Sequence, residues 1–133
     1  MSNRKLGNTF EDELCEILSG YGFWCTNLAQ KKSGQPADVI AAKNKKAYLI
    51  DAKVCSDNTF DLRRMEENQD TAMELWDICG NGLGWFALKL TDGQIFFISH
   101  YVIKAYRNKQ ASLSTKDIYE LGTPVEKWVK KCK

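Results

Sequence analysis

Two apolar runs decide how this chain folds, and they read Ala37-Asp38-Val39-Ile40-Ala41-Ala42 and Ala47-Tyr48-Leu49-Ile50-Asp51-Ala52-Lys53. Both runs are partly β-branched, and the polar segment Lys43-Asn44-Lys45-Lys46 separates them. This pattern predicts two antiparallel strands joined by a tight turn. With Asn44-Lys45 at the centre of that turn, Asp38 stands directly opposite Asp51, and directly opposed Cβ atoms are only about 4.5–5.5 Å apart.

Two carboxylates that face each other in an apolar hairpin repel, so their presence there needs a physical reason. A divalent cation supplies one, because Mg²⁺ and Mn²⁺ take one or two protein carboxylates and complete their shell with water and phosphate oxygens. Lys53 lies two residues after Asp51 and therefore on the same strand face. Its ammonium group is suited to hold or deprotonate an attacking water. The alternative is a solvated hairpin end with incidental charges.

The length and composition of the chain fit one domain with a substantial core. Its 133 residues include no linker rich in Pro, Gly or Ser. No apolar stretch approaches the ~18–20 residues that span a bilayer, and no signal-peptide core follows the polar start. We therefore expect a single domain over residues 1–133 in a soluble, cytoplasmic protein.

The cysteine and histidine content excludes several classes of site. The five cysteines are an odd set with no close pair along the sequence, which argues against a disulfide framework and a thiolate metal site. His100 is the only histidine, so a zinc cluster or a triad built on histidine is not expected.

The formal net charge of +2 is small, but the basic residues are clustered. The clusters are Arg4-Lys5, Lys31-Lys32, Lys43 to Lys46, Arg63-Arg64 and the tail Lys127 to Lys133. The loop from Lys31 to Pro36 leads directly into the strand that bears Asp38, so it either contacts a phosphate backbone beside the metal or is a flexible loop without that role. The tail either binds phosphate or packs its apolar residues.

The first helix is expected to begin near Asn8 as N-cap, with Phe10, Leu14, Ile17 and Leu18 on one apolar stripe. Glu11 lies at the flank of that stripe and either points toward the acidic pair or closes a capping box with Asn8. Spacing alone does not choose between these two roles.

A second helix is expected from about Leu62 to Ile78, with Met65, Met73 and Trp76 on one face. Gln69 lies in that apolar face, where its amide needs partners. Beside a metal site these partners are Lys53 or the attacking water, and otherwise the amide bonds to backbone.

Strands are expected at residues 23–28, at the hairpin described above, and at residues 85–90 and 94–99 around a Thr91-Asp92-Gly93 turn. The sheet then has about five strands. Residues 101–121 are weakly patterned, and Thr123-Pro124-Val125-Glu126 predicts a helix start with Thr123 as N-cap and Pro124 at the first helical position.

The order of these residues resembles the PD-(D/E)xK nuclease superfamily. The resemblance rests on Glu11, then Gln35-Pro36-Ala37-Asp38, then Ile50-Asp51-Ala52-Lys53, then Arg63-Arg64 with Gln69. Within the superfamily the chain most resembles Holliday junction resolvases of the archaeal Hjc type and, more distantly, the bacterial RecU type. The similarity runs from about Gly7 to Ile103, and residues 104–133 form an unassigned extension.

The resemblance implies an α/β fold of the restriction-endonuclease kind, a central mixed sheet of about five strands flanked by helices. It also implies a homodimer that cuts four-way DNA junctions. By position, Asp38 and Asp51 match metal ligands for Mg²⁺ or Mn²⁺, together with the backbone carbonyl of Ala52. Lys53 matches the catalytic lysine and Glu11 an additional acidic residue.

Other positions that the resemblance assigns lie around this site. Gln69 matches the helix residue behind it, and Ser33 matches a loop serine that contributes to activity. DNA contacts are expected from Lys31, Lys32 and Ser33 and from Arg63 and Arg64.

The sequence departs from the family pattern at two positions. Alanine precedes Asp38, and Asp51 stands where resolvases of this kind often carry glutamate, but both changes preserve the chemistry. Two alternatives stay open beside a junction-resolving, metal-dependent endonuclease. One is a restriction-like or repair nuclease acting on linear, flapped or nicked DNA, and the other is a nucleic-acid-binding module without catalysis.

Overall fold

A mixed β-sheet forms the centre of the protein in a computed structural model, which describes residues 9–28 and 37–132. Its six strands lie in the order β1-β2-β3-β5-β6-β8, and only the β3–β5 pair is parallel. The strands are β1 Trp24–Asn27, β2 Val39–Lys43, β3 Lys46–Val54, β5 Trp85–Lys89, β6 Ile95–Ser99 and β8 Thr123–Pro124. A separate two-stranded sheet pairs β4 Phe60–Asp61 with β7 Ser112–Leu113.

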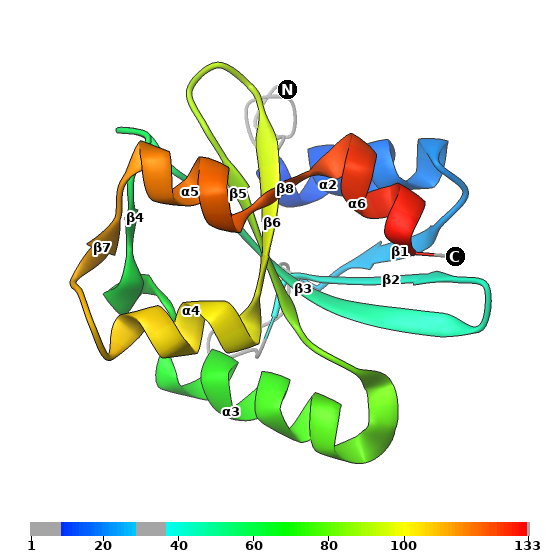
Figure 1. The fold of residues 1–133 in the computed structure, drawn as a ribbon. Coiled ribbons are helices and arrows are strands. Elements are labelled where there is room, and N and C mark those ends of the chain that lie inside the picture. Colours follow the sequence, from blue (N-terminus) through cyan, green and yellow to red (C-terminus); the bar gives the residue numbers. More distant parts are fainter. Residues whose placement is uncertain (1–8, 29–36, 133) are drawn as a thin grey trace.

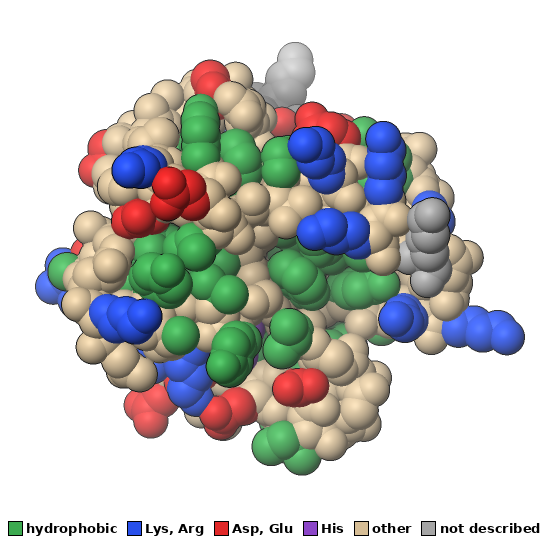
Figure 2. All heavy atoms as spheres, in the orientation of Figure 1, with side chains coloured by type: hydrophobic (Ala, Val, Ile, Leu, Met, Phe, Trp, Pro, Cys, Tyr) green, Lys and Arg blue, Asp and Glu red, His purple; other side chains and the backbone are tan. Residues whose placement is uncertain are grey.

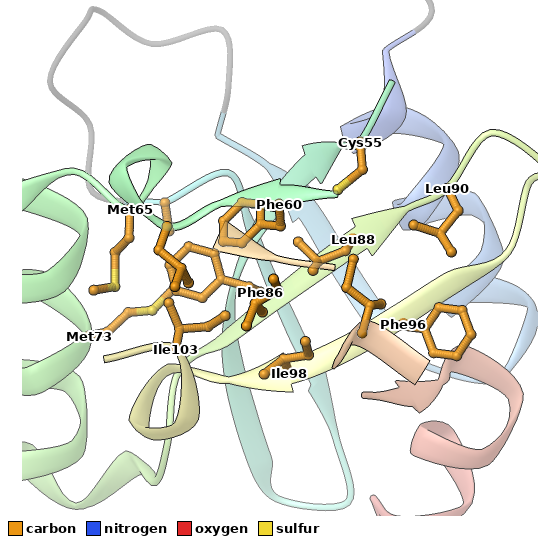
Figure 3. Packing of buried hydrophobic residues seen from close by; sticks show 14 of the residues in the cluster. Cys55, Phe60, Met65, Met73, Phe86, Leu88, Leu90, Phe96, Ile98 and Ile103 are labelled. Atoms are coloured by element: carbon orange, nitrogen blue, oxygen red, sulfur yellow. The ribbon is translucent and has the colours of Figure 1, made fainter. Parts of the chain in front are cut away.

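Helices cover both faces of the central sheet (Figure 1). They are α2 Phe10–Gly20, α3 Glu67–Trp76, α4 His100–Arg107, α5 Thr115–Leu121 and α6 Val125–Lys131, with the short turns η1 Leu62–Arg64 and η2 Asp77–Asn81. Helices α2 and α6 bury Leu14 and Trp128 in the core on one face. Helices α3, α4 and α5 bury apolar side chains in the core on the other face, part of which Figure 3 shows.

The β2–β3 hairpin has the predicted register. Lys43 pairs with Lys46 and Val39 pairs with Ile50. Both turn residues, Asn44 at φ 54° and Lys45 at φ 69°, lie in the left-handed region. Two such residues in succession form the tight turn whose twist matches that of the flanking strands. The turn chemistry therefore agrees with the observed register.

The N-cap of α2 lies one residue later than predicted. The predicted cap, Asn8, lies outside the described residues. Thr9 is the N-cap, and its Oγ1 accepts a hydrogen bond of 3.2 Å from the backbone N of Asp12. Asp12 rather than Glu11 therefore occupies the third helical position. The capping-box role proposed for Glu11 is wrong, because Glu11 is at the second position.

The single helix predicted from Leu62 to Ile78 is wrong, because the chain divides into η1, α3 and η2. Glu66 starts α3 through a capping box in which the Gln69 side chain accepts from the Glu66 backbone N. At its other end, α3 packs tightly against the segment that leads into β5. A Cβ atom on Gly84 would lie only 2.6 Å from Met73, so glycine is required there.

The C-terminal region contains more structure than the sequence pattern indicated. Helix α4, strand β7 and helix α5 occupy the weakly patterned stretch. The predicted helix begins one residue later than expected, since α6 starts at Val125 with Pro124, and not Thr123, as N-cap. Thr123 and Pro124 also form β8, which pairs with β6 and makes six strands where about five were expected. Trp128 of α6 then packs in the core, stacked on Phe97 at 4.1 Å between ring centroids.

All five cysteines are free, as the sequence predicted. The fold nevertheless brings two of them together, since the thiols of Cys15 on α2 and Cys25 on β1 hydrogen-bond each other. In the described part of the chain, no helix is both long and apolar enough to cross a membrane.

Candidate active site

The hairpin brings Asp38 and Asp51 together, as the predicted register required. The backbone N of Asp38 donates to the carbonyl of Ile50 at 3.1 Å, which extends the pairing one residue beyond β2. The Asp38 carboxylate turns toward β3, where Oδ2 accepts from the backbone N of Ala52 at 2.9 Å. Asp51 lies in the middle of β3 and is fully buried. The two acids therefore adjoin on neighbouring strands.

Lys53 lies on the same strand face as Asp51, as predicted. Its Nζ is 3.0 Å from Oδ2 of Asp51, and only 14% of the Lys53 side chain is exposed. The ammonium group thus sits at the buried carboxylate with limited access to water. A cation held in this way is placed to act on a phosphate group that approaches the carboxylate pair.

Gln69 of α3 contacts Asp51 rather than the predicted Lys53. Its Nε2 donates to Oδ1 of Asp51 at 3.1 Å, and its Oε1 accepts from the Glu66 backbone N at 3.1 Å. Both halves of this buried amide are therefore satisfied. The same side chain caps α3 and holds one oxygen of Asp51 in place.

The electrostatic state of Asp51 follows from its burial. Removal from water and, next, the neighbouring Asp38 raise the pKa of Asp51 while Lys53 lowers it, and the net result is a pKa of about 8. Among the described residues, Oδ2 of Asp51 has the Lys53 ammonium group as its partner, at 3.0 Å. One ammonium group beside two adjoining carboxylates leaves negative charge over, and carboxylate pairs of this kind fit a hard divalent cation.

Glu11 is not part of a carboxylate cluster in this structure. It is half-buried in the first turn of α2. Within residues 9–28 and 37–132, no three Asp, Glu, His or Cys side chains gather closely enough to hold a metal ion. The structure therefore brings together Asp38, Asp51, Lys53 and Gln69, and leaves Glu11 outside this group.

The residues expected to contact DNA fall into two sets. Lys31, Lys32 and Ser33 lie outside the described residues. Arg63 is exposed and forms two side-chain hydrogen bonds with Asp61, at 3.1 and 2.7 Å. Arg64 is also exposed, and its Nη1 donates to the carbonyl of Val54 at 2.9 Å. Because Val54 follows Lys53 directly, Arg64 is the arginine anchored beside the end of β3 that carries Asp51 and Lys53.

Sequence reasoning missed a charge network that ties α3 to α4. Asp70 accepts from Arg107 at 3.3 Å and lies 2.6 Å from Nε2 of the buried His100. Although burial raises the pKa of Asp70, its hydrogen bond to His100 and the charge of Lys104 hold it below the usual value. The partners are 30 and 37 residues away from Asp70, so no local pattern signals them. The network fixes the helix that carries Gln69.

Comparison with known proteins agrees with this geometry. The family model of archaeal Holliday junction resolvases (Hjc) matches residues 1–132, and therefore also the stretch after Ile103. The structure of Hjc from Archaeoglobus fulgidus, a Holliday junction resolvase from an archaeal hyperthermophile, superposes with a TM-score of 0.71. It covers 92% of this chain and 99% of that chain at 18% identity, a likeness that shows the fold. No curated protein matches the chain. The chain belongs to the archaeal Holliday junction resolvase (Hjc) family, a family of nucleases that resolve four-way DNA junctions.

Proposed function

We propose that the protein cleaves four-way DNA junctions by metal-assisted hydrolysis, leaving a 5′-phosphate and a 3′-hydroxyl, with Asp38 and Asp51 as ligands of Mg²⁺ or Mn²⁺. One observation carries this proposal. Asp51 is fully buried beside a second carboxylate, and the Lys53 ammonium, 3.0 Å away, is the partner of its Oδ2 in the described part of the chain. Such a pair of acids is costly unless a cation neutralises it. A bound divalent ion lowers the pKa of its water and polarises a phosphodiester oxygen.

The other residues of the site then have separate roles. As an ammonium, Lys53 orients the attacking water and stabilises negative charge on the phosphoryl oxygens, and only its neutral amine form could take the proton of the water. Gln69 holds Oδ1 of Asp51, which would fix the orientation of this carboxylate as a metal ligand. The backbone carbonyl of Ala52 is proposed as a further ligand. Glu11 is proposed to assist once substrate and metal are bound.

DNA is proposed to reach this site over basic residues at its rim. Arg64, anchored on Val54, is placed beside the catalytic strand. Arg63 becomes available when a phosphate displaces Asp61, with which it forms an exposed pair. Lys31, Lys32 and Ser33 are proposed to complete the contact from the loop that precedes Asp38.

A homodimer is proposed as the working form, because a junction is resolved by two cuts on symmetric strands. Three large apolar side chains support an interface on α3, η2 and α4. Leu75, Ile78 and Tyr101 are 58%, 78% and 70% exposed. Exposed apolar side chains grouped on adjacent elements are typical of an association surface.

The decisive experiment compares an immobile four-way junction with a linear duplex of the same sequence, each with Mg²⁺ and with EDTA. We expect cuts in the junction only, and only with the metal. Asp51→Asn removes a metal ligand without changing the shape of the side chain, and it should abolish these cuts. Glu120→Gln, an exposed carboxylate on α5, serves as the matched control and should cut normally.

Two results would overturn the proposal. Equal cutting of duplex and junction would indicate a nuclease for linear or nicked DNA. Junction binding without any metal-dependent product would indicate a binding module that has lost catalysis.

A further inference from the structure

A group of lysines lies away from the active site, at the tip of the β2–β3 hairpin and along α6. We call it the α6–hairpin patch and define it as Lys45, Lys46, Lys127, Lys130 and Lys131, all exposed. In Figure 2 the blue side chains gather over α6 and around the hairpin tip on the right. These lysines belong to two basic clusters of the sequence, Lys43 to Lys46 and the tail Lys127 to Lys133. The proposed active site uses neither cluster.

The two halves of the patch are joined by packing. Tyr48 of β3 contacts Trp128 of α6, with ring centroids 5.2 Å apart. Lys46 precedes Tyr48 by two residues and therefore extends from the same sheet face. Burial raises the pKa of the Cys132 thiol, while the nearby charges of Lys43 and Lys46 oppose that rise. The hairpin lysines thus lie near the C-terminal end of α6.

Helix α6 directs its lysines outward. Trp128, Val129 and Cys132 are buried. Residues advance by about 100° each around a helix, so Lys127, Lys130 and Lys131 occupy the arc opposite these three. The patch is therefore a largely basic surface on the face of the sheet covered by α2 and α6, with the exposed Glu126 beside Lys130 as one acidic residue on the same arc.

Acidic side chains do not neutralise this surface. Among the described residues, the ion pairs with carboxylates use Lys53, Arg63, Lys89, Lys104 and Arg107, together with His100. None of the five patch lysines takes part in these pairs. The unpaired lysine charge of the described chain is thus concentrated here.

Fold stability does not account for this arrangement. Lys43 and Lys46 are directly paired across the hairpin, where like charges destabilise. Lys127 and Lys131 are four residues apart on α6, where like charges also repel. The helix dipole favours only lysines of the last turn, Lys130 and Lys131, and disfavours Lys127 near the N-terminal end. An anionic partner removes each of these costs.

Shallow hollows border the patch at both ends. One of about 460 Å³ is lined by Lys127 and Lys131 together with the half-exposed ring of Tyr119. The other, of about 370 Å³, is lined by Lys45 and Lys46 and by the glycine-containing segment 80–83. Both provide room for an extended anion to follow the lysines from one end of the patch to the other.

The patch and the catalytic carboxylates point to opposite sides of the sheet. Asp51 faces α3, whereas Lys46, five residues away along β3, faces α6. At about 3.3 Å per residue the two positions are separated by roughly 16 Å along the strand. One straight duplex therefore does not touch both surfaces of the same subunit, but a branched DNA offers separate arms.

We propose that the α6–hairpin patch binds the sugar-phosphate backbone of a second DNA arm while the carboxylate site engages the strand to be cut. The proposal rests on the proposed junction-cleaving function and adds a separate surface to it. Duplex DNA carries one negative charge per about 1.7 Å of axis. A row of unpaired lysines can bind these phosphates whatever the base sequence.

The test compares two patch variants with a matched control in the full chain. The variants are Lys127→Gln/Lys131→Gln on α6 and Lys45→Asn/Lys46→Gln on the hairpin, where asparagine tolerates the positive φ of residue 45. The control, Lys109→Gln/Lys116→Gln, removes the same charge from exposed lysines elsewhere. Junction affinity is measured over a series of salt concentrations. Single-turnover cleavage is measured with protein in excess.

Each patch variant should bind the junction about tenfold more weakly at physiological salt and lower the salt-dependence slope by about 2. Binding of a short linear duplex and cleavage at saturating protein should match the wild type. Patch variants that bind like the control, beside a wild type that cuts junctions, overturn the patch alone. A wild type that neither binds nor cuts junctions overturns the proposed function and the patch together. If the patch variants lose binding to anionic lipid vesicles but bind the junction like the wild type, the surface binds a membrane and the proposal is overturned.

Discussion

At the scale of single residues, the site holds charges that the fold alone does not favour. Asp51 is the clearest case, since it is fully buried and faces a second carboxylate. Its contacts with Gln69 and Lys53 offset only part of that cost. Because Asp51 is a buried ionisable group, the free energy of unfolding should depend on pH and on bound metal.

We predict that Asp51 makes the metal-free protein less stable as pH rises from about 4 to 8. The unfolded chain ionises Asp51 near its usual pKa, whereas the folded chain does so at about 8. Between these values the folded state holds the extra proton, so the free energy of unfolding falls by about 1 kcal/mol per pH unit. Urea unfolding in EDTA should show that Asp51→Asn removes this fall. Parallel pH profiles for the two proteins would contradict the prediction.

Lys53 supports a second prediction at this scale. Lys53→Ala should lower single-turnover cleavage of a junction by about 10²- to 10³-fold, the cost of removing one preorganised charge from a site. Junction affinity should change little, because Lys53 is mostly buried at Asp51 and not part of a broad contact surface. Quench-flow rates and gel-shift affinities measure the two effects separately. Equal losses in affinity and rate would instead make Lys53 a DNA-binding residue.

At the scale of elements, the side chain of Gln69 links the N-terminus of α3 to the middle of β3. Gln69 caps the helix through Glu66 and also holds Asp51. The helix is fixed in turn by Asp70, which contacts His100 and Arg107 of α4. The position of one metal ligand thus depends on how two helices pack.

Two substitutions separate the roles of Gln69. Gln69→Ala removes both the cap and the contact with Asp51, and it should lower cleavage by about 10- to 100-fold, as loss of a ligand-orienting partner does. Glu66→Ala removes only the Glu66 side-chain half of the capping box and keeps both Gln69 hydrogen bonds, so it should cost about 1 kcal/mol of stability while leaving cleavage intact. Thermal unfolding and cleavage rates are measured on both proteins. A Glu66→Ala protein as slow as Gln69→Ala would show that the cap, and not the contact with Asp51, matters.

At the scale of the whole molecule, the exposed apolar side chains on α3, η2 and α4 form the proposed interface between two copies of the chain. Ile78→Asp should convert a dimer to a monomer, because it places a charge at the centre of the proposed interface. Tyr21→Ser, at an exposed aromatic away from that face, is the control. Sedimentation velocity distinguishes the two masses. A monomeric wild type, or an Ile78→Asp protein that remains a dimer, would refute this interface.

The chain itself determined the hairpin and its chemistry. Two apolar, partly β-branched runs, the polar turn between them and the spacing from Asp38 to Lys53 are local properties, so the register followed from the sequence. Only the tertiary structure decided that Gln69 bonds to Asp51, that Thr123 and Pro124 form a sixth strand, and that Asp70 meets His100. These contacts join residues far apart in the chain, and their free energy depends on packing that no local pattern records.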